Sequence, residues 1–331
     1  MRAFEYTSPK QKQQAVGLLG QKWEDAEVLA GGSDLLALMK DDIVHPKRLV
    51  NVKEVQELRG ISFTPSRGLR IGALMTLIEI SDDAQVKEHY PMLAHAVGDA
   101  ASPQIRNVAT IGGNMCQRPR CWWFRNGFGL LALGPNGKSL VLDGDNRHHA
   151  ILGNEGPAYF ISPSSVAPAL IAYNARIRLL GPKGPRELAL EKFFVIPKTE
   201  GEREHDLRPN EIVTDIVVPA PPSGAKAAHY EVRQKVAFDW PYATASVLLD
   251  MSGDSVRSAR VVMSHVAPIP WVSNEASQAL AGKTISEETA SAAGAAAVAN
   301  AKSLGRNKHK IQLARVAVKR ALLQAAKGGE A

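Results

Sequence analysis

The chain has 331 residues, which is too long for one ordinary hydrophobic core, so we expect two or three domains. Hydrophobic residues make up 45% and charged residues 22%, values that are typical of a globular protein. No apolar run approaches the ~20 residues that cross a bilayer, and the first residues lack the regions of a signal peptide. These features predict a cytoplasmic protein without a membrane span.

The formal net charge is +7, but the lysines and arginines are scattered, and no DNA- or RNA-binding motif is present. We therefore expect no nucleic-acid partner. A basic soluble surface, a docking face for an acidic partner and attraction for an anionic cofactor all fit this charge. The two cysteines, Cys116 and Cys121, exclude a disulfide framework. Two thiols also cannot supply the four ligands of an iron–sulfur cluster, so we predict no metal site.

The first part of the chain, about 1–57, alternates between strand-like and helix-like patterns, which predicts a small α+β unit. Its strands are expected at 4–6, 26–30 and 48–52, and its helices at 9–19 and 35–39.

The second part, about 58–222, mixes both patterns around a poorly periodic stretch at 115–158. Such a long irregular stretch in a compact domain is usually functional. Thr76 and Glu79 form a candidate capping box for a helix that starts at Leu77. The expected strands are 69–73, 108–111, 176–180 and 212–218, and the other expected helices are 91–101 and 163–171.

The segment 219–224 contains three prolines and a glycine, and is the clearest linker. The sequence beyond it predicts an α+β unit at 225–328, with strands at 242–251 and 258–266 and helices at 287–301 and 310–326.

A strand at 26–30 ends in Gly31 and Gly32, and a helix begins at once. Glycine lets the backbone approach a ligand without a Cβ clash. The free amides at a helix start suit a phosphate or pyrophosphate, and the Ser33 hydroxyl could donate to the same oxygens. A plain tight turn, with Ser33 or Asp34 capping the helix, fits the same spacing.

A second such segment runs from 101 to 114, where a predicted strand ends in Gly112 and Gly113, followed by Asn114. Two Gly-Gly turns, each followed by polar residues, suggest a long ligand threaded between two backbone loops. Two unrelated turns are the alternative.

Other nucleotide and metal motifs fail on inspection. No G-x-G-x-x-G pattern follows a strand, which argues against a Rossmann dinucleotide site. The segment 134–139 ends like a P-loop, but Ala132 stands where its first glycine should be. His148 and His149 are neighbours, and on a strand neighbours face opposite sides and chelate poorly.

The two Gly-Gly segments, in this order, resemble those of the FAD-binding subunits of the xanthine dehydrogenase and aldehyde oxidoreductase family. The resemblance extends to 69–73, 163–170, 211–213 and 266–271. It implies an α+β fold with a two-part FAD-binding domain of the vanillyl-alcohol-oxidase type at 1–222, divided into subdomains at about 1–57 and 58–222. An α+β C-terminal domain of the CO dehydrogenase flavoprotein type would follow at 225–328.

The resemblance also implies roles for individual residues around a bound FAD. One group would wrap the pyrophosphate, a second would bind the ribityl–flavin region, Arg120 would contact the cofactor, and Ile212 would pack near the flavin. Arg233 would stabilise negative charge on the flavin, with a surface or partner salt bridge as its alternative. The first group is Leu29, Ala30, Gly31, Gly32, Ser33, Asp34 and Leu35, and the second is Thr110, Ile111, Gly112, Gly113 and Asn114.

The sequence departs from the family after Asn114, where many members carry Ser-Pro-x-x-Asp. The segment 117–124 instead resembles periplasmic aldehyde oxidoreductases whose FAD subunit also holds a [4Fe-4S] cluster. Cys121 matches one cluster position, but 125–160 contains no cysteine, so we predict no cluster. Trp122 and Trp123 could shield the flavin or serve as plain packing. Ser165 replaces a common Asp and is expected to cap the following helix.

The family implies an electron-transfer subunit that accepts electrons from a small [2Fe-2S] subunit and passes them to an external acceptor. A molybdenum-containing large subunit would hydroxylate an aldehyde or N-heterocycle. Because this chain lacks the ligand motifs for molybdenum and [2Fe-2S], both belong to partners in a heterotrimer. A partner with a signal sequence could carry the complex to the periplasm. The alternatives are a stand-alone flavin oxidase or dehydrogenase, and a flavin-free scaffold protein.

Overall fold

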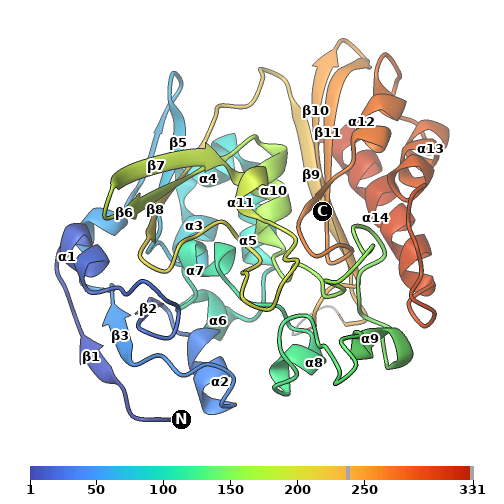
Figure 1. Ribbon diagram of the computed structural model, residues 1–331. Helices are drawn as coiled ribbons and strands as arrows, with labels where there is room; N and C mark the ends of the chain where they lie inside the picture. The colour runs from blue at the N-terminus through green and yellow to red at the C-terminus, as the bar shows by residue number, and fades with distance from the viewer. Residues whose placement is uncertain (236–238, 329–331) are drawn as a thin grey trace.

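The computed structural model describes residues 1–235 and 239–328, and within them the chain forms three sheets with helices packed around them (Figure 1). The first sheet is parallel, in the order β1-β3-β2. Its alternating strands and helices confirm the small α+β unit expected at the N-terminus. The elements of this part are β1 (Glu5–Thr7), α1 (Lys12–Gly17), β2 (Glu27–Leu29), α2 (Leu35–Lys40), β3 (Arg48–Asn51) and the 3-10 turn η1 (Gln56–Leu58).

The second sheet is antiparallel, in the order β4-β5-β8-β6-β7. Its core includes Leu69, Ile71, Ile177 and Ile216, all fully buried. Around it lie β4 (Ile61–Thr64), β5 (Gly68–Gly72), α3 (Leu77–Asp82), α4 (Ala84–His89), α5 (Pro91–Gly98), α6 (Pro103–Arg106), α7 (Ile111–Met115), α8 (Trp122–Arg125), α9 (Leu140–Asp143), α10 (Val166–Ala172), β6 (Arg176–Gly181), β7 (Gly184–Ala189), α11 (Leu190–Phe193) and β8 (Ile212–Val218).

The third sheet, in the order β12-β11-β10-β9, belongs to the C-terminal part and has helices on both faces (Figure 1). Helices α12 and α14 contact one face, and α5 and α10 contact the other. Gly294 lets α13 and α14 pack closely, because a Cβ there would lie 2.5 Å from the Arg315 carbonyl oxygen. The elements are β9 (Lys226–Val232), β10 (Ala243–Ser252), β11 (Ser255–Ser264), β12 (Trp271–Val272), α12 (Asn274–Leu280), α13 (Glu287–Ala297) and α14 (His309–Ala326).

The prediction of a strand at 108–111 is wrong, and the difference affects the second Gly-Gly segment. The Thr110 hydroxyl caps a one-turn helix, α7, by accepting a hydrogen bond from the Gly113 amide at 3.2 Å. Gly112 and Gly113 therefore lie in a helical first turn and not in a turn after a strand. A local cap, together with a bond from the Gly112 amide to the Ala73 carbonyl, outweighs the strand tendency of a short apolar run.

Two predicted helix caps have different outcomes. The Thr76 and Glu79 capping box is confirmed, with both reciprocal hydrogen bonds formed. Ser165 occupies the N-cap of α10, but its side chain makes no capping hydrogen bond. The preceding hydroxyl, Ser164, accepts the Ala167 amide at 2.9 Å instead. The Ser165 prediction is therefore wrong by one residue.

A buried ammonium group ties the irregular 145–155 segment to the C-terminal part. Lys310, fully buried on α14, donates to the backbone carbonyls of His148 at 2.9 Å, His149 at 3.1 Å and His265 at 2.7 Å. Buried charges are found where hydrogen bonds compensate for the lost water. The loop hydrogen bonds therefore depend on the long side chain of one residue.

Replacing Lys310 by Met should lower the free energy of unfolding by about 3 kcal/mol, because three buried carbonyl oxygens lose their hydrogen-bond donor. Urea unfolding followed by circular dichroism would measure it. Lys302→Met is the control, since Lys302 is an exposed member of a long ion pair with Glu155 and should change stability little. A loss for Lys310→Met no larger than for the control would contradict the prediction.

Candidate functional site

A cavity of about 470 Å³ lies where the two Gly-Gly segments meet. Residues from later parts of the chain, among them Ile212 and Arg233, also line it. Most residues predicted from the sequence line it. These are Ala30, Gly31, Gly32, Ser33, Asp34, Leu35, Thr110, Gly112, Gly113, Asn114, Arg120, Ile212 and Arg233. Leu29 and Ile111 lie behind the wall, buried in two of the hydrophobic cores. The structure thus brings together segments that are far apart in the sequence.

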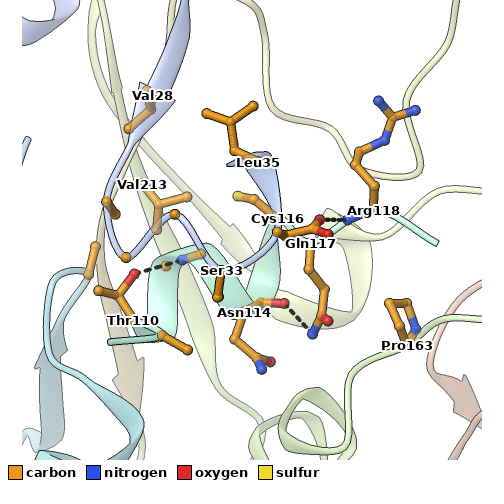
Figure 2. A pocket seen from close by; sticks show the side chains of 18 of the residues that line it. Val28, Ser33, Leu35, Thr110, Asn114, Cys116, Gln117, Arg118, Pro163 and Val213 are labelled. Carbon is orange, nitrogen blue, oxygen red and sulfur yellow. Dashed lines mark hydrogen bonds between the residues drawn. The ribbon is translucent and has the colours of Figure 1, made fainter. Parts of the chain in front are cut away.

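Backbone contact between the two Gly-Gly segments is the central feature of the cavity. A Cβ on Gly31 would lie 1.9 Å from the Val108 carbonyl oxygen, so this position requires glycine. Gly32 follows with a φ of +72°, which turns the chain into α2. The amide of Leu36 in that helix donates to the Gly32 carbonyl at 3.1 Å, whereas the amides that precede it at the helix start have no intrahelical acceptor. Figure 2 shows Ser33, Thr110 and Asn114 grouped around the same part of the pocket.

The second Gly-Gly segment is fixed from behind by backbone hydrogen bonds. The amides of Ile111 and Gly112 donate to the carbonyls of Met75 at 2.9 Å and Ala73 at 3.0 Å. At the other end of α7, Asn114 accepts a hydrogen bond from the Ser164 hydroxyl at 2.7 Å. These contacts fix the place of the segment in the cavity wall.

Asp34 was predicted to bind the cofactor, and the structure shows its carboxylate engaged with the protein. It accepts the Arg118 backbone amide at 2.8 Å, the Arg120 guanidinium at 2.6 Å and the Arg125 guanidinium at 2.7 Å. Asp34 thereby links the first Gly-Gly loop to the segment that follows α7. The Arg120 side chain, so held, also lies over the Trp240 ring, 5.1 Å from its centroid.

A group of ionisable side chains in the cavity lining was not found from the sequence. Arg203 pairs with Glu27 at 2.7 Å and stacks over the Trp23 ring at 4.1 Å. Nearby, Arg118 pairs with Glu204 at 2.5 Å. Glu27 and Arg203 are 176 positions apart, so no local pattern connects them.

Burial controls the protonation of Glu27 and of two other lining residues, Cys116 and His205. It raises the pKa of Glu27 above its ordinary value, although the Arg203 guanidinium opposes that shift. It also raises the pKa of the Cys116 thiol to about 12 and lowers the pKa of His205 to about 3. At neutral pH the thiol is protonated and the imidazole is neutral, so the positive charge here comes from Arg118 and Arg203, each of which already pairs with a carboxylate.

The aromatic pair after the second segment lies outside the cavity lining that the described residues form. Trp122 is 52% exposed, and Trp123 packs edge-on against Phe128 with ring centroids 5.4 Å apart. This geometry favours plain packing over a flavin shield. Cys116 and Cys121 are both free. Within the described part of the chain, no group of three or more His, Cys, Asp or Glu is placed to hold a metal ion.

The cavity therefore offers glycine backbone at close approach, first-turn amides, polar hydroxyl and amide side chains, arginines and apolar surface, which fits a long phosphate-bearing cofactor. Residues 2–221 match the FAD-binding domain of molybdopterin dehydrogenases, and residues 228–325 match the CO dehydrogenase flavoprotein C-terminal domain. The chain belongs to the molybdenum hydroxylase family. It is an FAD-binding subunit, and so a flavoprotein oxidoreductase subunit. The predicted family and cofactor are confirmed.

Relatives along nearly the whole chain support the same family. The FAD-binding subunit PaoB of an Escherichia coli aldehyde oxidoreductase is 31% identical over 273 residues, 82% of this chain and 84% of PaoB. The carbon monoxide dehydrogenase medium chain of Hydrogenophaga pseudoflava is 32% identical over 296 residues, 89% of this chain and 86% of the medium chain.

A solved structure of carbon monoxide dehydrogenase from Hydrogenophaga pseudoflava matches with a TM-score of 0.78 and 30% identity, and the match covers 99% of both chains. The predicted fold class, an FAD-binding domain followed by an α+β C-terminal domain, is confirmed. The domain limits at 1–222 and 225–328 stay a prediction. Among residues 1–235 and 239–328, no helix is long and apolar enough to cross a bilayer.

Proposed function

We propose that this subunit binds FAD in the cavity between its two Gly-Gly segments and conducts electrons from a [2Fe-2S] partner subunit to an external acceptor. The large subunit of the same complex would hold the molybdenum cofactor and hydroxylate an aldehyde or an N-heterocycle. The observation that carries the proposal is the close approach of Gly31 to the Val108 carbonyl. It brings the two Gly-Gly segments together in the wall of one cavity, where both could contact the same FAD molecule. When bound, FAD supplies the electron-accepting and electron-donating chemistry.

The chain's own residues would bind and orient the cofactor. The amides and hydroxyl of 29–35 would hold the pyrophosphate, with Leu29 packed behind them. Residues 110–114 would contact the ribityl–flavin region, with Ile111 packed behind. Arg120 and Ile212 would border the bound molecule, and Arg233 would place a positive charge beside the flavin. All but Leu29 and Ile111 line the cavity, which supports these assignments.

The names of the relatives support a complex with other subunits, since they are described as an FAD-binding subunit and a medium chain. A heterotrimer with one molybdenum-containing large subunit and one [2Fe-2S] small subunit is the assembly that we propose. The proposal places it in the cytoplasm, with export alongside a signal-bearing partner as the alternative. A stand-alone flavin enzyme would need a catalytic base at the cavity, and the buried His205, whose pKa burial lowers to about 3, is unsuited to that task.

The absorption spectrum of the purified chain tests the cofactor assignment, together with iron analysis and identification of the released flavin. We expect flavin absorption bands, one bound FAD for this cavity, and no iron. A colourless protein that cannot be reconstituted with FAD would contradict the proposal and favour the flavin-free scaffold. Stoichiometric iron would contradict the prediction that this chain holds no cluster.

A further inference from the structure

A row of polar side chains leads along β9 to the cavity. His229, Glu231 and Arg233 occupy alternate positions at the end of this strand and just beyond it. Alternate positions on a strand face the same side, and β9 packs against α5. Arg233, the last of the three, lines the cavity together with Asn114 and Trp240.

Each side chain in this row contacts the next one. His229 Nδ1 lies 2.8 Å from the Ser246 hydroxyl, on the residue opposite it in β10. Its other ring nitrogen, Nε2, lies 3.2 Å from the Glu231 carboxylate, which also forms an ion pair with Arg233. The Arg233 guanidinium donates to the Asp99 backbone carbonyl at the end of α5, at 2.8 Å.

Burying the Glu231 carboxylate at this position costs free energy, because the charged group is removed from water. Its side chain is 4% exposed. Although burial favours the neutral acid, the His229 hydrogen bond and the charges of His229 and Arg233 hold the pKa of Glu231 at about 2. A buried ion pair often adds no stability over an apolar pair of similar volume. Strand pairing alone therefore does not account for this row.

We propose that Glu231 is a positioning residue, which fixes the Arg233 guanidinium at the cavity wall and so favours reduced over oxidised FAD. The inference rests on the proposed function, in which Arg233 borders the flavin. A fixed cation stabilises negative charge better than one that must first be ordered. His229 and the Asp99 carbonyl hold the pair from its two ends.

Two further ionisable groups face this row from α5. His95 lies 3.2 Å from the Asp99 carboxylate, and its ring meets the His229 ring edge-on, with centroids 5.9 Å apart. The hydrogen bond with Asp99 raises the pKa of His95. Because His95 can change charge, the variants below are compared at one fixed pH.

The test uses the full chain loaded with FAD and measures the two-electron midpoint potential of the bound flavin. Arg233→Met should weaken the binding of reduced FAD relative to oxidised FAD about tenfold, which lowers the midpoint potential by about 30 mV. Glu231→Asp keeps the charge but withdraws the carboxylate by one methylene, and should weaken this relative binding about threefold. In the Arg233→Met background, Glu231→Asp should have no further effect. Arg257→Met removes an exposed cation on β11 and should leave the potential unchanged.

An unchanged potential in Glu231→Asp would overturn the proposal, and so would an equal shift with and without Arg233. Glu231→Gln is a second test if the Asp variant does not fold. Gln keeps the length but loses the charge that attracts Arg233, so the midpoint potential should fall. A rise would show that the carboxylate merely offsets the Arg233 charge. If wild-type protein binds no FAD, the proposed function itself has failed, which is a distinct result.

Discussion

Gly31→Ala should reduce FAD affinity at least a hundredfold, which is about 2.7 kcal/mol. The new Cβ would lie 1.9 Å from the Val108 carbonyl oxygen and 2.7 Å from its carbon, whereas ordinary contact begins at 3.4 Å. Both neighbours are backbone atoms, so one Gly-Gly segment must move away from the other. Overpacking of this kind also lowers stability by about 1–3 kcal/mol. Fluorescence titration of the apoprotein with FAD, alongside thermal unfolding, would measure both effects.

The matched control is Gly17→Ala, in the same N-terminal unit. Gly17 ends helix α1, and a Cβ there would meet nothing within 4 Å. Alanine suits a helix better than glycine by about 1 kcal/mol, so this variant should bind FAD normally and be at least as stable. If Gly31→Ala bound FAD as tightly as this control, the close approach of the two loops would be irrelevant to cofactor binding.

Asp34→Asn should weaken FAD binding about tenfold and lower the free energy of unfolding by about 2 kcal/mol. Removing one partner of a buried ion pair costs about 3–5 kcal/mol, and the partial exposure of Arg120 reduces that figure here. The asparagine oxygen can still accept the Arg118 amide, but Arg120 and Arg125 lose a charged acceptor. The first Gly-Gly loop would then be less firmly tied to the segment after α7. FAD titration and urea unfolding on one preparation would measure both changes.

Asp145→Asn provides the comparison for Asp34→Asn. Asp145 also pairs with an arginine, Arg147, but this pair lies at the surface, where solvent screens the charges. We expect unchanged FAD binding and unchanged stability. If Asp34→Asn changed FAD binding and stability as little as Asp145→Asn, the three contacts of Asp34 would not hold the loop in place.

Much of the fold could be predicted because local chemistry specifies it. Thr76 and Glu79 have the spacing of a capping box and form one, and long strands such as β10 and β11 have clear patterns. The strand expected at 108–111 did not form because the Thr110 cap and the hydrogen bond from Gly112 to Ala73 stabilise a helical turn there. The short sequence 108–111 is compatible with either structure. Four residues are too few for periodicity to distinguish a strand from a helical turn.

The candidate site was only partly predictable, for a different reason. The glycines of 31–32 and 112–113 carry their own signal, since repeated Gly-Gly pairs mark a backbone that something must approach closely. Arg203, Trp23 and Glu27 carry none, because their importance arises from an ion pair and a ring contact that form only after folding. Asp34 lay inside a predicted motif, yet its arginine partners, which follow α7, could not be inferred from spacing.

The three hydrogen bonds of Lys310 limit how this subunit can be recombined with its relatives. The ammonium comes from the last helix, while two of its acceptors are backbone carbonyls at His148 and His149 in the region matched by the FAD-binding family. The 219–224 linker is the natural junction for a chimera between two relatives. A chimera joined there would take the Lys310 donor from one parent and the 148–149 carbonyls from the other. Exchangeable modules of this protein are therefore defined by shared hydrogen bonds, and a recombinant must carry the 145–155 segment and α14 from one parent.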